Sequence, residues 1–268
     1  MTRRARLDAE LVRRGLARSR QQAAELVAAG QVRVPGRASV KPATQVTTAD
    51  PIVVDEHEGE RYVSRGGHKL AGALDAFAPR GLEVSGRSAL DAGASTGGFT
   101  DVLLRRGARS VVCVDVGYGL LAWSLRTDPR VRVLDRTNVR DLDPALVGDP
   151  VDVVVADLSF ISLRLALPAL AATAVEYADL LVMVKPQFEV GKDALGAGGV
   201  VRDPAQRASA VADVAAAAYD GQRLGVAGVT ASPLPGPAGN VEYFLWLRRD
   251  APTLDHDDLS RAVAEGPP

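Results

Sequence analysis

Three ionisable residues adjoin apolar runs in the second half of the chain, and their positions suggest proton chemistry. Asp157 follows the run 151–156, Lys185 follows the run 180–184, and Glu242 stands at the start of the run 241–247. The carboxyl ends of parallel strands share one edge of an open sheet, and a final antiparallel strand begins at that edge. We therefore expect Asp157, Lys185 and Glu242 to converge. Each alone is a common strand-end residue, but together they could hold or move a proton.

A glycine-rich turn lies upstream, within Ser-Ala-Leu-Asp-Ala-Gly-Ala-Ser-Thr-Gly-Gly-Phe-Thr at residues 88–100. An apolar run ends at Asp91, and the turn contains Gly93, Gly97 and Gly98 before a helical pattern begins. Glycines allow backbone to approach a nucleotide-like ligand. The spacing fits neither the dinucleotide fingerprint nor a phosphate-binding Walker loop. The strand-end carboxylate suits a cationic ligand such as S-adenosylmethionine (SAM), and an ordinary strand-to-helix turn is the alternative.

Two further polar residues follow the next predicted strands. Asp115 lies near the end of the strand 111–116, where it could accept hydrogen bonds from ribose hydroxyls, and Asn138 follows the strand 131–134, where it could border an adenine. Strand and helix signals then alternate to the end of the run 241–247, with a helix expected from Leu163 to Tyr177. This alternation predicts an α/β fold with a Rossmann-like sheet that is parallel except for one antiparallel strand.

Several classes of protein are disfavoured by the composition. The single cysteine, Cys113, lies in an apolar run, so a disulfide framework or a Cys/His metal cluster is not expected. The sequence after Met1 has no apolar segment typical of a secretory signal, and no apolar run reaches the roughly 18 residues of a membrane helix. We therefore expect a cytoplasmic protein that does not insert into membranes, with no metal required.

The N-terminal part of the chain is strongly basic. Residues 1–48 hold nine arginines and one lysine against three acidic residues, a net charge of +7, whereas the whole chain has a net charge of −1. This asymmetry predicts a nucleic-acid-binding module, and a merely solvated, arginine-rich helix face is the alternative. Two short helices are expected, the second capped by Ser19, together with strands at 32–34, at Val40 and at 52–54.

The predicted domain organisation follows from these patterns. Residues 1–54 are expected to form a small α+β nucleic-acid-binding domain, and the polar, acidic stretch 55–63 to form a linker. Residues 64–250 form the expected catalytic domain, and 251–268 a polar tail with a short helix. The sequence does not define the oligomeric state.

The chain also resembles known families. Arg-Leu-Asp-x-x-Leu-Val-x-x-Gly-Leu-Ala-x-Ser-Arg-x-x-Ala-x-x-Leu at residues 6–26, followed by Gly-Gln-Val-Arg-Val at 30–34, resembles the small RNA-binding domain named after ribosomal protein S four. Tyr-Val-Ser-Arg-Gly-Gly-His-Lys-Leu at 62–70, the glycine turn, Ala-Asp-Leu-Ser-Phe-Ile-Ser at 156–162, Val-Lys-Pro-Gln-Phe-Glu at 184–189 and Gly-Asn-Val-Glu-Tyr-Phe at 239–244 are similar to the TlyA family.

That family comprises cytoplasmic ribosomal RNA methyltransferases, also labelled haemolysins, with an FtsJ-type catalytic domain. The resemblance implies SAM-dependent 2′-O-methylation of ribose, with cytidine as the target, in rRNA of one or both ribosomal subunits. The catalytic Lys-Asp-Lys-Glu tetrad of FtsJ-type enzymes falls on Lys69, Asp157, Lys185 and Glu242. The implied SAM-binding residues are Asp91, Gly93, Ser95, Gly97, Gly98, Phe99, Asp115, Asn138 and Asp157. The implied RNA-binding residues are Arg3, Arg4, Arg6, Arg13, Arg14, Arg18, Arg20, Arg33 and Arg65.

Other functions remain open at this point. One is a haemolysin or other membrane-active protein, which the absence of an apolar span or a long amphipathic helix disfavours. Another is an RNA-binding ribosome assembly factor without catalysis, which the presence of all four tetrad residue types disfavours. A third is a methylase of bases, which the lack of a catalytic cysteine near the site disfavours.

Overall fold

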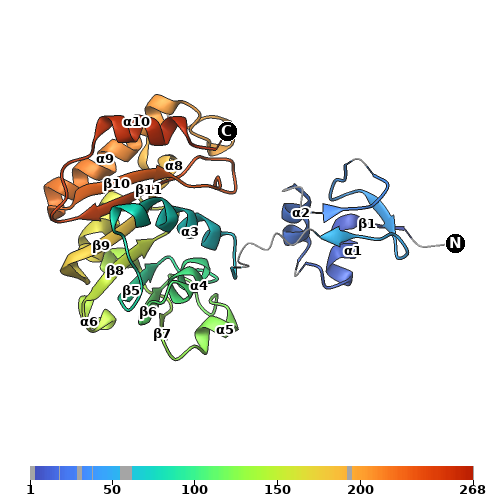
Figure 1. Cartoon of the computed structure of the whole chain (residues 1–268), viewed down its shortest axis with the longest axis horizontal. Helices are drawn as coiled ribbons and strands as arrows, with labels where there is room; N and C mark the ends of the chain where they lie inside the picture. The colour runs from blue at the N-terminus through green and yellow to red at the C-terminus, as the bar shows by residue number, and fades with distance from the viewer. Residues whose placement is uncertain are drawn as a thin grey trace. The chain divides into compact units, whose positions relative to one another are not determined.

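The computed structural model describes residues 4–17, 19–28, 32–37, 39–54, 62–191 and 195–267. The chain divides into two compact units, Met1–Arg61 and Tyr62–Pro268, which we call the head and the body (Figure 1). Of the predicted linker, 55–61 lie outside the described residues, as do Arg3 and Arg18.

Within its described residues, the head contains two short helices and two small antiparallel strand pairs, β1 with β3 and β2 with β4. Its core is built from Leu7, Leu11, Ala23 and Val46, all fully buried. The predicted cap of the second helix is confirmed, because Ser19 Oγ accepts a hydrogen bond from the backbone N–H of Gln22 at 3.1 Å. The elements are β1 (Arg4–Arg6), α1 (Leu7–Arg13), α2 (Arg20–Ala28), β2 (Val32–Arg33), β3 (Gln45–Thr47) and β4 (Val53–Val54).

The head differs from the prediction in its strands. Val40 is not in a strand, whereas β1 and β3, which pair Ala5 with Val46, were not predicted. Each of these strands is only three residues long, and β1 carries two arginines, so neither has an apolar alternation that could be recognised in the sequence.

The body is built on one seven-stranded sheet with the order β10-β11-β9-β8-β5-β6-β7. Strands β5 to β9 are mutually parallel, whereas β11 runs antiparallel to both β9 and β10, as predicted for the last strand. The chain leaves β5 toward β6 on one side and returns to β8 on the other, so the turn after β5 lies at a topological switch point. The strands are β5 (Ser88–Ala92), β6 (Ser110–Val114), β7 (Val131–Leu134), β8 (Val151–Ala156), β9 (Ala174–Val184), β10 (Gly225–Ala231) and β11 (Tyr243–Arg248).

Helices cover both faces of this sheet (Figure 1). The longer helices are α3 (Gly66–Phe77), α4 (Gly98–Arg105), α7 (Leu163–Ala172), α9 (Pro204–Gln222) and α10 (His256–Ala264). The short ones are η1 (Ala78–Arg80), α5 (Trp123–Arg126), η2 (Val139–Asp141), α6 (Pro144–Val147), α8 (Pro186–Glu189) and η4 (Ala197–Gly199). Strand β8 shows how the sheet is sandwiched: Val153 and Val155 pack in the core formed with α3 and α4, while Val154 and Ala156 pack in the core formed with α7, α9 and α10.

Several predicted elements of the body have different bounds in the structure. The strand expected at 111–116 is β6, which ends at Val114 and leaves Asp115 just beyond it. The helix expected from Leu163 to Tyr177 ends at Ala172, and β9 already begins at Ala174. The segment Val175-Glu176-Tyr177 includes a β-branched and an aromatic residue, which favour a strand over a continued helix. The C-terminal segment contains α10, whose Leu259 and Ala262 are buried in the same core as α9.

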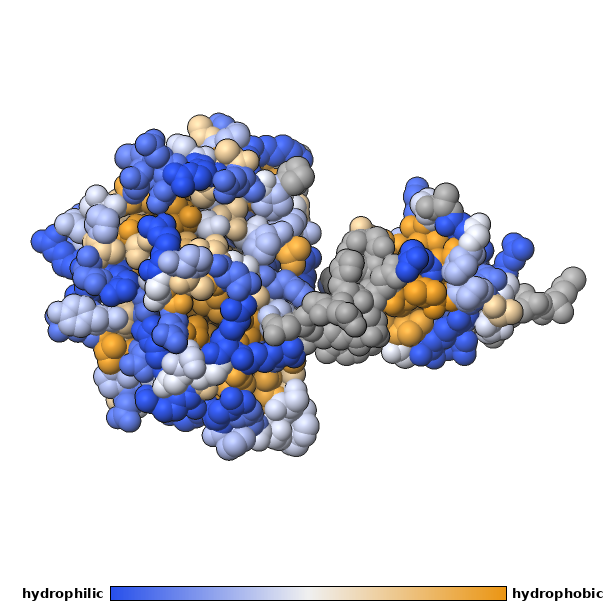
Figure 2. All heavy atoms as spheres, in the orientation of Figure 1, coloured by the Kyte–Doolittle hydropathy of each residue, from blue (hydrophilic) through white to orange (hydrophobic). Residues whose placement is uncertain are grey.

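The surface view shows hydrophilic side chains over most of the visible face of each unit, with hydrophobic residues between them (Figure 2). Within the described part of the chain, no helix combines the length and the hydropathy needed to cross a membrane.

Candidate active site

Strand register brings the predicted catalytic residues to one edge of the body. Ala156, which precedes Asp157, pairs with Val182 of β9, and Val184, which precedes Lys185, pairs with Tyr243 of β11. Since Tyr243 directly follows Glu242, the sheet itself places Asp157, Lys185 and Glu242 side by side. This arrangement follows from the parallel β8 and β9 and the antiparallel β11.

The four residues form two ion pairs. Lys69 Nζ, on α3, lies 2.5 Å from Glu242 Oε2, and their side chains are 6% and 1% exposed. Lys185 Nζ lies 2.7 Å from Asp157 Oδ1, and here the side chains are 10% and 24% exposed. The first pair is thus almost completely shielded from water, while the second has a more accessible carboxylate. Each lysine ammonium is therefore neutralised by its own carboxylate, and the two ion pairs lie at the same edge of the sheet.

A proline-rich loop, residues 232–240, packs over the first of these pairs. The backbone N–H of Ser232 donates to the carbonyl oxygen of Glu242 at 2.8 Å, and a Cβ at Gly236 would lie only 2.6 Å from Glu242 Oε1. Arg65 donates to the carbonyl oxygen of Pro235 at 2.7 Å. The loop, the segment before α3 and Glu242 are thus fitted closely together.

Other segments of the body closely approach the backbone of the glycine turn. Gly93 has φ +82° and Gly97 has φ +96°, both in the left-handed region that favours glycine. A Cβ at Gly93 would lie 2.4 Å from the Asp157 carbonyl oxygen, one at Gly97 would lie 2.3 Å from Leu125, and one at Gly98 would lie 2.3 Å from Ser64 Oγ. These glycines are therefore required for close contacts within the protein, and their role in admitting a ligand stays a prediction.

Asp91, at the end of β5, is fully buried beside this turn. Its Oδ2 accepts a hydrogen bond from Thr100 Oγ1 at 2.6 Å, while its Oδ1 receives no well-aligned hydrogen bond from the described residues. Burial, with smaller contributions from the charges of Asp157 and Asp115, raises the pKa of Asp91 to about 7, although hydrogen bonding from Thr100 opposes the change. A buried carboxyl oxygen without a good partner at a switch point fits a cationic ligand such as SAM.

The other residues predicted to bind SAM lie in different environments. Asp115 accepts hydrogen bonds from the backbone N–H groups of Ser95 (2.8 Å) and Gly117 (2.7 Å), so its carboxylate organises both loops. Asn138 is exposed and accepts from the backbone N–H of Arg140 at 3.1 Å, which caps η2. The ring of Phe99 is buried and packs 6.0 Å from that of Phe244, so it belongs to the core.

Two polar residues of the site were not singled out from the sequence. Ser159 Oγ accepts a hydrogen bond from Lys185 Nζ at 2.8 Å, and Thr100 is the partner of Asp91. Both belong to the motifs that carry the family resemblance, and Ser159 is two residues beyond Asp157. That proximity was the available signal, but serine and threonine are too common in loops for it to be decisive.

The structure places the predicted RNA-binding arginines of the head in two groups. Arg6, Arg13 and Arg20 project from the domain and are 46%, 58% and 60% exposed. Arg14 is different: it is 21% exposed and donates to the carbonyl oxygens of Thr47, Thr48 and Asp50. The resemblance implies that Arg14 binds RNA, but in the structure its guanidinium joins the end of α1 to the loop after β3.

Buried carboxylates fix the projecting arginines. Asp8 pairs with Arg6 at 2.9 Å and Arg20 at 3.1 Å, and Glu10 pairs with Arg13 at 2.6 Å. The hydrogen bonds from Arg6 and Arg13 lower the pKa values of Asp8 and Glu10, each to about 2.

Three more arginines were predicted to bind RNA. Arg4 and Arg33 of the head are exposed, and so is Arg65 of the body.

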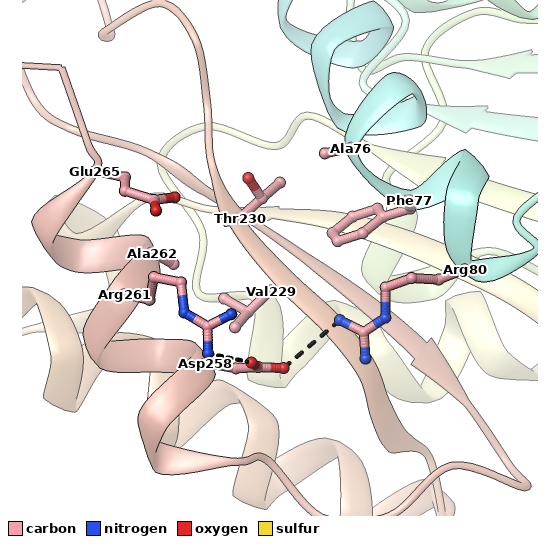
Figure 3. Close-up of a pocket in the computed structure, with 9 residues that line it drawn as sticks. All are labelled: Ala76, Phe77, Arg80, Val229, Thr230, Asp258, Arg261, Ala262 and Glu265. Atoms are coloured by element: carbon pink, nitrogen blue, oxygen red, sulfur yellow. Dashed lines mark ion pairs between the residues drawn. The ribbon is translucent and has the colours of Figure 1, made fainter.

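A separate cavity of about 160 Å³ lies between the end of α3, β10 and α10 (Figure 3). Asp258 stands at its edge and forms ion pairs with Arg80 at 3.5 Å and Arg261 at 3.2 Å. None of the predicted site residues lines this cavity.

Comparisons with known proteins agree with this arrangement. The model of the FtsJ-like methyltransferase family matches residues 62–249, and that of the S4 domain matches residues 5–52. The chain is 61% identical to the 16S/23S rRNA (cytidine-2′-O)-methyltransferase TlyA of Mycobacterium tuberculosis over 277 positions, which cover 100% of each chain. It is 35% identical to Hemolysin A of Brachyspira hyodysenteriae, covering 89% of this chain and 98% of that one.

A solved structure shows the same architecture. A hemolysin-named protein from Streptococcus thermophilus is 37% identical, with a TM-score of 0.77 over 99% of this chain and 96% of that one. The order of the two domain matches and the full-length identity identify the chain as a member of the TlyA family of FtsJ-like, SAM-dependent methyltransferases.

Proposed function

We propose that this protein transfers a methyl group from SAM to the ribose 2′-hydroxyl of cytidines in the 16S and 23S RNA of the two ribosomal subunits. The observation that carries this proposal is the full-length 61% identity to a methyltransferase named for that reaction. The two lysine–carboxylate pairs at the edge of the sheet support it, because a 2′-hydroxyl is a weak nucleophile that needs help to lose its proton. The reaction would take place in the cytoplasm, where ribosomal subunits are found.

Residues of the glycine turn would hold the cofactor. Asp91 would face its cationic methionine end, the backbone of Gly93, Ser95, Gly97, Gly98 and Phe99 would follow its length, and Asp115 and Asn138 would approach its ribose and adenine. When bound, SAM supplies a methyl group on a positively charged sulfur. The buried carboxyl of Asp91, which has one oxygen without a good partner, is what supports this placement.

The two lysines would have different roles toward the 2′-hydroxyl. Lys185, whose pair is the more accessible, would first lose its own proton, which Asp157 or water can accept, and its neutral amine, positioned by Asp157 and Ser159, would then take the proton of the 2′-hydroxyl. Lys69, fixed by Glu242, would orient the hydroxyl and stabilise the negative charge that develops on the oxygen. Asp157 adjoins both the glycine turn and Lys185, so it would stand between the cofactor and the sugar.

The head would supply the affinity for folded RNA. A 2′-hydroxyl is alike on every nucleotide, so the target has to be selected through RNA shape. Projecting arginines, held in place by buried carboxylates, are suited to phosphate groups in a defined geometry. The arginines we assign to this contact are Arg3, Arg4, Arg6, Arg13, Arg18, Arg20 and Arg33, with Arg65 at the edge of the body.

The test is methyl transfer by the full chain. Purified protein is incubated with tritiated SAM and ribosomal subunits that lack the modification, and the RNA is digested to nucleosides for mass spectrometry. We expect label in 2′-O-methylcytidine from both subunits. Label in a base-methylated nucleoside, or binding of SAM without any incorporation, would overturn the proposal.

The Lys185→Ala variant tests whether Lys185 takes part in the chemical step. We expect it to bind SAM with an affinity close to that of the wild type, measured by calorimetry, and to lose methyl transfer. If transfer remained near normal, Lys185 would have no part in the chemistry.

A further inference from the structure

Glu189, the last residue of α8, is a buried carboxylate outside the four residues of the two ion pairs. Its side chain is 1% exposed, and both of its oxygens are engaged at the start of α7. Oε1 accepts from the backbone N–H of Leu163 at 2.7 Å, and Oε2 accepts from Ser162 Oγ at 2.6 Å. A buried carboxylate is costly unless it is hydrogen-bonded, so these contacts fasten α8 to the first turn of α7.

The other end of α8 holds the same loop. Residues 157–162 leave β8 and lead into α7, and Lys185, directly before α8, contacts Asp157 at 2.7 Å and Ser159 at 2.8 Å. The ring of Phe188, within α8, lies 5.3 Å from the ring of Phe160. The helix therefore contacts the loop near its start, in its middle and, through Glu189, at its end.

The conformation of this loop requires such support. Phe160 has φ +64°, in the left-handed region that a residue with a side chain seldom adopts, and it is 91% exposed. Strained backbone of this kind persists when the surrounding structure fixes it, and it often occurs at functional sites. Asp157 is fixed by its place at the end of β8, where its N–H donates to the Ala92 carbonyl oxygen at 3.0 Å. Glu189 fixes the opposite end.

We propose that Glu189 is a positioning residue, which keeps the 157–162 loop against α8 so that Lys185 retains its contacts with Asp157 and Ser159. This inference rests on the proposed function, since it assigns Glu189 to the geometry of the lysine that would accept the proton. Glu189 itself would not touch RNA or cofactor. Its effect would be on the placement of Lys185, and small displacements of a reacting group lower a rate strongly.

The experiment compares two substitutions at Glu189 with a control at Asp179. In Glu189→Ala both acceptors are lost, whereas Glu189→Gln keeps an oxygen for Leu163 and an amide that can pair with Ser162. Asp179 lies on β9, is 6% exposed and accepts from Trp246 Nε1 at 2.6 Å, but it lies toward the other end of the sheet from Lys185. Asp179→Asn is therefore matched for the loss of a buried carboxylate.

Activity is measured at a temperature at which all variants are folded. We expect Glu189→Ala to lower kcat by about tenfold or more, with KM for the RNA and the affinity for SAM within about twofold of wild type. Glu189→Gln should recover most of kcat. Asp179→Asn should lower the melting temperature yet leave kcat unchanged. A wild-type kcat in folded Glu189→Ala, or an equal loss in Asp179→Asn, would reduce Glu189 to a purely structural role.

Hydrogen exchange separates this inference from the proposed function. Amides of residues 158–161 should exchange faster in Glu189→Ala than in wild type or Asp179→Asn, whatever the substrate of the enzyme. Unchanged exchange there would overturn the positioning role. If exchange rises but the wild type methylates no RNA, then Glu189 does hold the loop and the proposed substrate is wrong.

Discussion

The ammonium of Lys69 lies 2.5 Å from the carboxylate of Glu242, although 173 residues separate the two in the sequence. Lys69 comes from the first helix of the body and Glu242 from the residue before the last strand of the sheet. Both side chains are nearly free of solvent contact. A buried pair of this kind depends on both partners, because either charge alone would be left in a poorly solvated place.

Glu242→Gln should therefore lower both stability and activity. Removing the carboxylate leaves Lys69 buried without its counter-charge, and we expect the free energy of unfolding to fall by about 3 kcal/mol. Chemical denaturation measures this loss. The double variant Lys69→Met/Glu242→Gln removes both charges, and it should be more stable than Glu242→Gln while still failing to transfer methyl groups. A double variant that regains transfer would show that the pair has only a structural role.

Gly93→Ala should be damaging for a reason internal to the protein. The new Cβ would lie 2.4 Å from the Asp157 carbonyl oxygen, and φ is +82° at this position. We expect the free energy of unfolding to fall by about 1–3 kcal/mol and SAM to bind more weakly, since the turn and Asp157 would have to move apart. Gly119 has φ +67°, and a Cβ there would meet nothing within 4 Å, so Gly119→Ala controls for the backbone conformation alone. Calorimetric titration should show weaker SAM binding in Gly93→Ala than in Gly119→Ala. Equal affinities would mean that the close approach of residue 93 to the Asp157 carbonyl oxygen is unimportant.

The strand ends of the body were the most predictable part of the site. The buried parallel strands are short apolar runs ending in polar residues, so the positions of Asp157 and Lys185 follow from the sheet alone, and the antiparallel β11 adds Glu242. Lys69 could not be placed in this way, because a helix-start lysine looks like an exposed cation. Only the resemblance to FtsJ-type enzymes singled it out, and only the fold shows that it is buried against Glu242.

The roles of some charged residues depend on contacts with residues far away in the sequence, which no local sequence pattern can predict. Arg14 resembles its neighbour Arg13 in sequence, but one guanidinium projects while the other is tied to three carbonyl oxygens more than thirty residues away. Glu189 lay within a recognised motif, yet its role depends on the N-terminus of α7, 26 residues upstream. Such long-range polar contacts appear only once the chain is folded.

The affinity for SAM should depend on the ionisation of Asp91. Its pKa is raised to about 7, so in the free protein the carboxyl is largely neutral below that pH and ionised above it. A cationic ligand favours the ionised form, and affinity should increase as the pH rises through about 7. We expect binding at pH 6 to be roughly tenfold weaker than at pH 8, with proton release that calorimetry in buffers of different ionisation enthalpy can detect.

The stability of the free protein should change in the opposite direction. A carboxyl whose pKa is raised on folding holds a proton in the folded state that the unfolded chain has released, so its contribution to stability is fully present below its ordinary pKa of 3.8, decreases as the pH rises from there to about 7, and is lost above that value. Asp91→Asn should remove both pH dependences. The groups that face Asp91 are Thr100 and Cys113, with the charges of Asp157 and Asp115 nearby, and Asp115→Asn is the control. Retained proton release in Asp91→Asn would assign the linkage to another group.

The arginines of the head should separate into those that bind RNA and one that stabilises the domain. Arg20 is 60% exposed and held by Asp8, so Arg20→Ala should weaken RNA binding and reduce the slope of log affinity against log salt by about one. Arg14→Ala should instead lower the stability of the head, because three carbonyl oxygens lose their donor. Filter binding to rRNA fragments over a range of salt concentrations, beside thermal unfolding, measures both effects.

The pairing of Asp8 with Arg20 should persist at neutral pH, since the pKa of Asp8 is about 2 and its carboxylate stays ionised there. An unchanged salt slope in Arg20→Ala would exclude this guanidinium from phosphate contact. Loss of rRNA methylation on deleting residues 1–54, with SAM binding intact, would then place the contact on other residues of the head.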